Sequence, residues 1–237
     1  MKRLLTTLTF VVATLAMMAQ GWPENYGGVM LQGFYWDGYA DSKWTVLEQQ
    51  ADELSQYFDL IWIPQSGKTS DYYHTQRQTM GYDPCFWLDH NSCWGTEEEL
   101  KNMIKTFKDK GTGIIEDVVI NHKNGLTTWT DFPDETSGDY SLVWDNTDFS
   151  GICSNDECNK NGYKTTGDKD TGDNFDGYRD LDHTNETVQK NVMTYLDFLL
   201  KELGYVGFRY DMVKGYAAKY TGMYNVSACI LAKVEIQ

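Results

Sequence analysis

The chain has 237 residues, of which 41% are hydrophobic and 14% aromatic, enough to build one or two packed domains. Its 35 acidic and 20 basic residues give a formal net charge of −15, which would repel phosphate backbones and anionic membranes and so argues against nucleic acid as a partner. The 8 Trp and 16 Tyr residues exceed what disordered segments carry; most of these rings should serve packing, although flat sugars also stack on such rings.

The first residues have the pattern of a secretory signal peptide. Met1, Lys2 and Arg3 precede an apolar run over 4–18, and Ala19 precedes a polar chain. The run is too short to span a membrane, and no later stretch is long enough to do so. We therefore expect residues 1–19 to be removed and the mature chain to be secreted or periplasmic, without a membrane partner.

Strand and helix patterns alternate along the rest of the chain. The predicted strands are 29–34, 60–64, 113–121 and 207–211, and the predicted helices are 44–57, 96–110 and 188–203. Thr96 and Glu99 form a capping box at the start of the second helix, and Gly111 follows its end. The first strand is predicted to be buried, and the third is apolar until its end, as in a parallel strand covered on both faces.

A segment rich in Asp, Asn, Gly, Ser and Thr, residues 123–183, interrupts this alternation and is far longer than an ordinary strand-to-helix connection. The order of elements predicts an α/β fold with a parallel sheet, which fits a (β/α)8 TIM barrel with an insertion after its third strand. A dinucleotide-binding fold is excluded, because no glycine-rich fingerprint follows the first strand. The predicted segments are a signal peptide (1–19), a first barrel segment (20–122), the insertion (123–183) and a barrel continuation (184–237).

The five cysteines are Cys85, Cys93, Cys153, Cys158 and Cys229. Export permits disulfides, and the local pairs Cys85 with Cys93 and Cys153 with Cys158 are near enough in sequence to bridge. Neither pair lies near a histidine cluster of the kind that zinc requires, so we expect local disulfides or free thiols instead of a metal.

Two predicted strands end in polar residues: 117–122 reads DVVINH, and 209–214 reads RYDMVK. Because alternate residues of a strand share a face, Arg209 and Asp211 should lie on the same side, where the guanidinium can hold the carboxylate ionised. From spacing alone, such an Arg-x-Asp pair is more often a structural ion pair than a catalytic one.

DVVINH at 117–122 and GFRYDMVKGY at 207–216 resemble two short motifs of glycoside hydrolase family 13, the α-amylase family. MGYDP at 80–84 is similar to the family's loop after the second strand, and YRDLDH at 178–183 is similar to a motif near the end of its inserted domain. The motifs occur in the family's order. Lys-Gly at 214–215, where many members have Lys-His, looks most like the plant-type and related bacterial subgroup.

The resemblance implies endo-acting, retaining hydrolysis of α-1,4-glucosidic bonds in starch-like or glycogen-like glucans. Asp211 would be the nucleophile, and Arg209 would fix its charge. The resemblance further implies substrate contacts by Tyr82, Asp117, His122 and Lys214. It makes an α-glucan the expected partner of a monomeric protein.

The resemblance also implies a Ca²⁺ held by the side chains of Asn121 and Asp180 and by a backbone oxygen near Gly215. Oxygen donors from distant segments suit this cation, and closing so long a loop is a stabilising role more than a chemical one. The acidic run 168–176 does not match an EF-hand loop, and we interpret it as a solvated loop.

The family's general acid is a Glu at the end of the fifth strand, and Glu235 lies close to the expected separation from Asp211. Its sequence surroundings differ from the family pattern, since no small residue precedes it and no aromatic follows it. If 230–234 begins a fifth strand, the chain holds an N-terminal portion of the barrel, about four to five strands, and we expect weak starch hydrolysis or none. Glu116 also departs from the family, which has a small or apolar residue there.

Two other functions fit the same residues. A non-catalytic glucan-binding protein would keep the aromatic residues and release no reducing sugar. A related transglycosylase would use the same nucleophile to pass the glycosyl group to another sugar, which product analysis would distinguish from hydrolysis.

Overall fold

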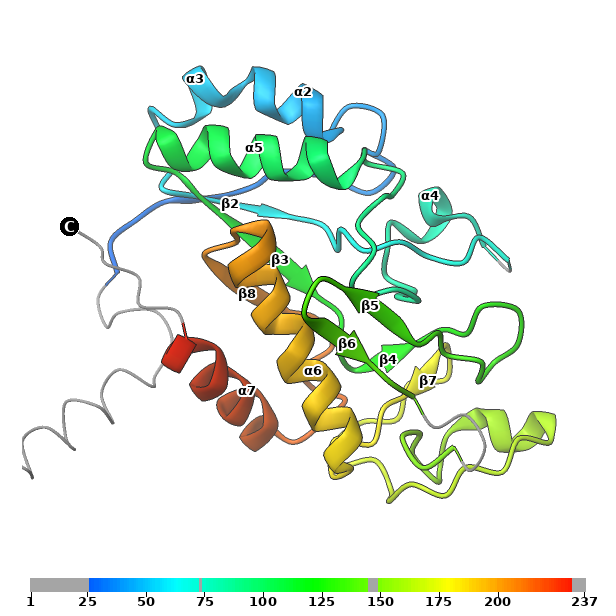
Figure 1. Ribbon diagram of the computed structural model, residues 1–237. Helices are drawn as coiled ribbons and strands as arrows, with labels where there is room; N and C mark the ends of the chain where they lie inside the picture. The colour runs from blue at the N-terminus through cyan, green and yellow to red at the C-terminus, as the bar shows by residue number, and fades with distance from the viewer. Residues whose placement is uncertain (1–25, 73, 145–148, 232–237) are drawn as a thin grey trace, which may run out of the picture.

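The computed structural model describes residues 26–72, 74–144 and 149–231 (Figure 1). The predicted signal peptide and Glu235 lie outside these ranges. Within them, no helix is both long enough and apolar enough to cross a membrane.

A four-stranded parallel sheet forms the centre of the fold. Its strands are hydrogen-bonded in the order β1 (Met30–Gln32), β2 (Leu60–Ile63), β3 (Gly113–Val118) and β8 (Gly207–Tyr210). In register, Leu60 lies opposite Met30 and Gly113, and Ile115 lies opposite Gly207. The strand order follows the chain order, as in the predicted barrel.

The first strand is shorter and more exposed than predicted. β1 pairs only with β2 among the described strands, and the relative exposure of Met30 is 50%. By contrast, every residue of β3 after Gly113 is buried. A short apolar run does not distinguish an edge strand from a central one, because both read as apolar in sequence.

Helices α2 (Trp44–Gln49), α3 (Ala51–Leu54) and α5 (Glu97–Asp109) form one layer over the sheet (Figure 1). The predicted helix 44–57 is therefore divided at Gln50. The predicted capping box of α5 is confirmed: Thr96 Oγ1 accepts a hydrogen bond from Glu99 N, and the Glu99 carboxylate accepts one from Thr96 N. Gly111 follows in the left-handed region, at φ +86°.

Helix α6 (Glu186–Phe198) continues into a π-helical turn, η2 (Leu199–Leu203), and ends at Gly204 as predicted. It packs against α7 (Ala218–Leu231), and its last turn, η2, contacts α5 (Figure 1). Ile230 and Leu231 lie in α7, so the expected fifth strand does not begin at 230. Apolar residues there suit a helix as well as a strand.

The inserted segment contains little regular structure. Strand β4 (His122–Lys123) leads into it, and its other elements are β5 (Glu135–Ser137), β6 (Tyr140–Leu142), η1 (Glu157–Asn161) and β7 (Arg179–Asp180). A short helix, α4 (Gln76–Thr79), lies in the separate loop between β2 and α5. β4 pairs with β7 and β5 pairs with β6, both antiparallel. Lys123 is fully buried and donates to Cys85 O at 2.6 Å, which fastens the insertion to the loop before α5.

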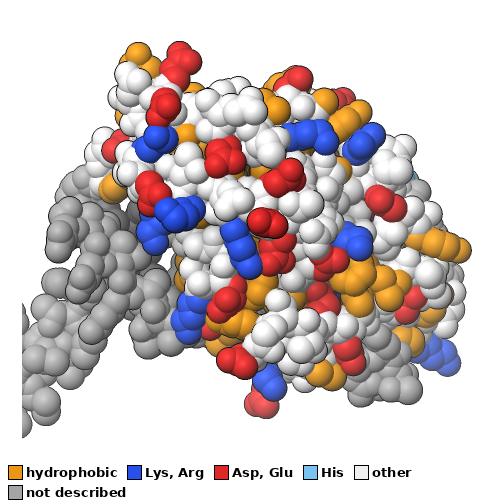
Figure 2. Space-filling model, turned by 45° about the horizontal axis from the view of Figure 1, so that its top comes forward, with side chains coloured by type: hydrophobic (Ala, Val, Ile, Leu, Met, Phe, Trp, Pro, Cys, Tyr) orange, Lys and Arg blue, Asp and Glu red, His pale blue; other side chains and the backbone are white. Residues whose placement is uncertain are grey.

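Of the two alternatives for the cysteines, the structure shows free thiols at Cys85, Cys93, Cys153 and Cys158. Burial raises the pKa of the Cys85 thiol to about 12, which keeps it protonated. Acidic side chains are spread over the face shown in Figure 2, with basic ones between them.

Candidate active site

The carboxyl ends of the parallel strands bring the predicted site residues together. Asp117 on β3 lies opposite Arg209 on β8 in the register of the sheet. Asp211 follows β8, and its backbone N donates to Val118 O at 3.0 Å, which extends the pairing by one residue. Parallel strands place such residues at the carboxyl-terminal end of the sheet, which is the end where (β/α) barrels carry their sites.

Arg209 lies between two carboxylates. Its Nη1 is 2.9 Å from Asp117 Oδ1 and 2.5 Å from Asp211 Oδ1. The prediction that Arg209 and Asp211 share a side is therefore confirmed. Burial raises the pKa of Asp117 to about 6, although the Arg209 charge and the Tyr82 hydroxyl oppose that rise.

Tyr82 reaches the same carboxylate from the loop after β2. Its hydroxyl donates to Asp117 Oδ2 at 2.8 Å, and burial together with this carboxylate raises the pKa of Tyr82. The turn before it requires glycine: Gly81 has φ +84°, and a Cβ there would lie 2.6 Å from Gln65 O. The backbone of the MGYDP segment thus sets the direction of the Tyr82 ring.

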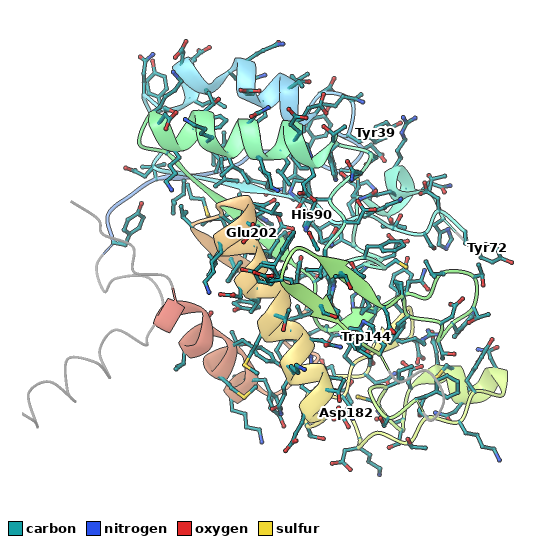
Figure 3. The ribbon with its side chains drawn as sticks, in the orientation of Figure 1. Tyr39, Tyr72, His90, Trp144, Asp182 and Glu202 are labelled. Carbon is teal, nitrogen blue, oxygen red and sulfur yellow. The ribbon has the colours of Figure 1, made fainter. Side chains whose placement is uncertain are left out.

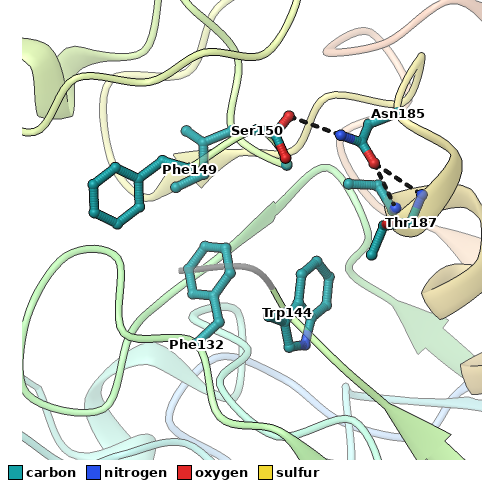
Figure 4. Close-up of a pocket in the computed structure, with 9 residues that line it drawn as sticks. Phe132, Trp144, Phe149, Ser150, Asn185 and Thr187 are labelled. Atoms are coloured by element: carbon teal, nitrogen blue, oxygen red, sulfur yellow. Dashed lines mark hydrogen bonds between the residues drawn. The ribbon is translucent and has the colours of Figure 1, made fainter. Parts of the chain in front are cut away.

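A cleft of about 560 Å³ opens over these residues, a volume typical of small-molecule sites. Its lining residues are Trp36, His74, Gln78, Thr79, Tyr82, His122, Phe175, Tyr178, Asp211 and Met212. Figure 3 shows the described side chains as sticks on the ribbon, in the orientation of Figure 1. A smaller pocket between the insertion and the start of α6, lined by Phe132, Trp144 and Asn185 among others, holds only about 20 Å³ (Figure 4).

Aromatic rings form two walls of the cleft. The Trp36 ring stacks on Tyr82 with centroids 6.0 Å apart, and the His122 ring lies 5.0 Å from Phe175 and 5.4 Å from Tyr178. Phe175 and Tyr178 come from the insertion and were not predicted as site residues. Rings beside carboxylates and imidazole suit a ligand that has apolar faces and many hydroxyl groups.

His122 and Lys214 differ in their position relative to the cleft. His122 lines it, with Nε2 3.0 Å from Tyr82 O, and burial lowers its pKa, which favours the neutral ring. Lys214 lies apart from the lining residues: its side chain is 68% exposed and is 3.4 Å from Asp173. The structure therefore does not bring Lys214 into the cleft.

A second polar cluster lies where the insertion meets the barrel, and it unites the residues predicted to hold a metal. Asn121 Nδ2 donates to Asp180 Oδ1 at 3.0 Å. Gly215 packs so closely on Asn121 that a Cβ there would lie 2.0 Å from Asn121 Oδ1. These residues come from three segments that are distant in sequence.

The run 168–176 is mostly exposed, as expected of a solvated loop, but Asp170 is half-buried beside this cluster. The Asp170 carboxyl lies near enough to that of Asp180 for the two negative charges to repel each other. Burial, then the charges of Asp170 and Asp156, raise the pKa of Asp180 to about 8. In the part of the chain that the structure describes, no group of three or more His, Cys, Asp or Glu residues is arranged to hold a metal ion, so amide and backbone oxygens would have to complete any such site.

Comparison with known proteins agrees with this geometry. A family profile described as "Alpha amylase, catalytic domain" matches residues 69–228. The chain is 29% identical to chloroplastic alpha-amylase 3 of Arabidopsis thaliana, over 83% of this chain and 21% of that protein. It is 28% identical to probable alpha-amylase 2 of the same plant, over 83% of this chain and 44% of that protein.

Solved structures give the same result for the fold. The alpha-amylase of Geobacillus thermoleovorans, in complex with acarbose, matches with a TM-score of 0.60 and 17% identity over 85% of this chain and 40% of that one. Alpha-amylase I of Eisenia fetida matches with a TM-score of 0.56 and 22% identity over 87% of this chain and 41% of that one.

Fold and site together define a partial (β/α)8 barrel with an acid–arginine–acid cluster at the carboxyl ends of its strands. The chain belongs to the α-amylase catalytic-domain family. It spans 21% and 44% of the length of the two plant relatives, and about 40% of the two solved structures.

Proposed function

We propose that this chain carries the nucleophile half of a retaining α-glucan hydrolase site, which cleaves internal α-1,4-glucosidic bonds of starch-like or glycogen-like chains. The observation that carries the proposal is that Asp211, paired with Arg209, lines a cleft with aromatic walls. The α-amylases among the relatives support it. An α-glucan is the proposed partner, and export is the proposed route.

In the proposed reaction, a carboxylate oxygen of Asp211 bonds to the anomeric carbon while the bond to the leaving glycosidic oxygen breaks. The leaving oxygen takes a proton from a general acid, and water later releases the sugar from Asp211. Arg209 pairs with Asp211 and holds the carboxylate in place for the attack. Tyr82, His122 and Asp117 position the sugar.

The general acid is proposed from sequence separation alone. A retaining mechanism places its two carboxyl groups roughly 5–5.5 Å apart. Glu235 lies outside the described residues, and helix α7 occupies the position expected for the strand that precedes it. Lys214 is proposed to reach the leaving-group side only if it gives up Asp173, its partner at 3.4 Å.

We further propose that Asn121, Asp180, Asp170 and the Gly215 backbone oxygen hold a Ca²⁺. The crowded, buried carboxylates and the close approach of Gly215 to Asn121 support this, because a cation would relieve the repulsion between the acids. When bound, the ion would supply a structural link between the insertion and the barrel.

Substitution of the nucleophile tests the proposed reaction. In a reducing-sugar assay on soluble starch with calcium, Asp211→Asn should lower hydrolysis by about 10³-fold or more, because the attacking group is lost. Asp139→Asn, at an exposed acid outside the cleft lining, is the control and should keep the parent rate.

Three outcomes separate the alternatives. Hydrolysis that survives Asp211→Asn shows that the nucleophile assignment is wrong. A chain that binds a linear maltooligosaccharide in calorimetry but releases no reducing sugar is a glucan-binding protein. Longer glucans among the products, in place of free reducing ends, indicate a transglycosylase.

A further inference from the structure

We propose that Trp62 is a positioning residue of this site, whose indole orients the Asp117 carboxylate and the Arg209 guanidinium and, through Arg209, the nucleophile Asp211. The inference deepens the function proposed above and rests on it for the role of Asp211. Trp62 lies in the apolar stretch of a strand and belongs to none of the motifs identified in the sequence.

Trp62 contacts two members of the charged cluster at once. Its Nε1 donates to Asp117 Oδ2 at 3.1 Å, and the Arg209 guanidinium carbon lies 5.0 Å from the centroid of its ring. Asp117 and Arg209 are themselves paired at 2.9 Å. The three side chains therefore form a closed triangle in which each contacts the other two.

The backbone of Trp62 is held on both sides. It lies on β2, paired in register with Gln32 of β1 and Ile115 of β3. The Phe34 ring meets the indole edge-on, with centroids 5.3 Å apart. An indole with so little freedom presents its N–H in one direction, which is what positioning of a partner requires.

The Asp117 carboxylate has two donors on its Oδ2 atom, and they differ in origin. Tyr82 comes from a loop and its ring also forms a wall of the cleft, whereas Trp62 comes from the sheet. An indole N–H can only donate, so it stabilises an acceptor, and it stabilises an ionised acceptor most. Trp62 thus holds Oδ2 of Asp117 in place even if the Tyr82 ring moves with its loop.

Several charged or titratable groups surround Asp117 and influence its protonation equilibrium. Arg209 and Asp211 face it from β8 and the residue after it, Tyr82 faces it from the loop, and Glu116 adjoins it on β3. Burial and Asp211 favour the neutral acid, while Arg209 and Tyr82 favour the carboxylate. Loss of the Trp62 donor should shift this balance toward the neutral acid.

Carboxyl ¹³C NMR of the 237-residue chain tests the inference without a need for turnover. The Asp117 signal is identified by its absence in Asp117→Asn. Trp62→Phe keeps a ring beside Arg209 and removes the N–H, so the titration midpoint of Asp117 should move up by roughly one pH unit, the size of a lost hydrogen bond to a charged group. Trp36→Phe, in the cleft wall against Tyr82, is the matched control and should leave the midpoint in place.

The indole N–H signal of Trp62 gives a second measurement on the unsubstituted chain. It should shift with pH at the Asp117 midpoint, and that shift should vanish in Asp117→Asn. An unchanged midpoint in a folded Trp62→Phe variant overturns the inference. If that variant does not fold, an indole signal that ignores Asp117 ionisation overturns it.

These results are independent of whether the chain cleaves glucan. If the Asp117 midpoint shifts in Trp62→Phe but Asp211→Asn has no effect on hydrolysis, the role of Trp62 stands and the assignment of Asp211 as nucleophile is wrong. In a chain that hydrolyses starch, Trp62→Phe should lower kcat more than it changes KM, and the acid limb of the rate profile should move to higher pH with the Asp117 midpoint.

Discussion

Two adjacent carboxyl groups of β3 face opposite sides of the sheet and differ in environment. Asp117 faces Arg209 and Tyr82. Glu116 is fully buried on the other side, where its Oε1 accepts bonds from Ser66 N at 2.9 Å and Ser66 Oγ at 3.0 Å. Burial raises the pKa of Glu116 to about 8, so it is a neutral acid at pH 7. The residue that departs from the family pattern is therefore accommodated as an uncharged group.

We predict that Glu116→Gln removes a pH dependence of stability. The folded pKa of Glu116 is raised from 4.5 to about 8, so its contribution is full below pH 4.5 and is lost as pH rises toward 8. The free energy of unfolding of the wild type, relative to the variant, should fall across this window by up to about 1.4 kcal/mol per pH unit. Urea unfolding at several pH values measures it, with the exposed Glu98→Gln as control. Parallel pH curves for wild type and Glu116→Gln would contradict the assignment.

A methyl group at position 215 should disturb the junction between barrel and insertion. A Cβ there would lie 2.0 Å from Asn121 Oδ1, so Asn121 or the backbone must move. We expect Gly215→Ala to destabilise the chain by about 1–3 kcal/mol in urea unfolding, as overpacking does. Gly27→Ala, whose Cβ would meet nothing within 4 Å, should show no such loss. Equal effects of the two substitutions would mean that the junction is loosely packed.

At the scale of elements, helix α5 depends on its first turn. Thr96→Ala removes the side-chain acceptor of Glu99 N and should cost about 1 kcal/mol of unfolding free energy. Asn102→Ala, at an exposed position within the same helix, should cost nothing, because Ala is the better helix former. Chemical denaturation with far-UV circular dichroism measures both. A Thr96→Ala variant as stable as Asn102→Ala would show that the cap contributes little.

Elements with local signals could be predicted from the sequence. The Thr96–Glu99 box, Gly111 and Gly204 mark helix ends by their own chemistry, so α5 and α6 were predicted nearly at their observed bounds. The exposure of β1 and the helical state of Ile230 depend on tertiary neighbours, which an apolar run does not reveal.

The same distinction applies to the site. Asp117, Arg209 and Asp211 could be predicted because motifs at strand ends converge in a parallel sheet. Trp62 was missed because its chemistry is hidden in an apolar strand, and Asp170 was missed because a long loop gives no sign of which acid turns inward. Lys214 was placed by motif alone, and its exposed pairing with Asp173 could not be read from sequence.

For the whole molecule, the proposed cation should link the barrel and the insertion. We predict that Ca²⁺ raises the thermal unfolding midpoint and that EDTA lowers it, with a stabilisation of about 2.7 kcal/mol when free Ca²⁺ is 100 times its Kd. Asp180→Asn should abolish the effect, and Asp170→Asn should weaken it. Asp139→Asn, in the exposed turn between β5 and β6, should leave it intact. A calcium response that survives Asp180→Asn would place the ion elsewhere.

The order of strands in the sheet also bears on how the chain is made. Because β1, β2 and β3 are neighbours in both sequence and space, each can join an edge that already exists while the protein leaves the ribosome. β8 is different, because the whole insertion must be synthesised before β8 can pair with β3. During that interval β3 presents an unpaired edge, the kind of surface on which chains associate wrongly. The length of the insertion therefore determines how long the edge of β3 stays unpaired during synthesis. The yield of folded protein should depend on that length.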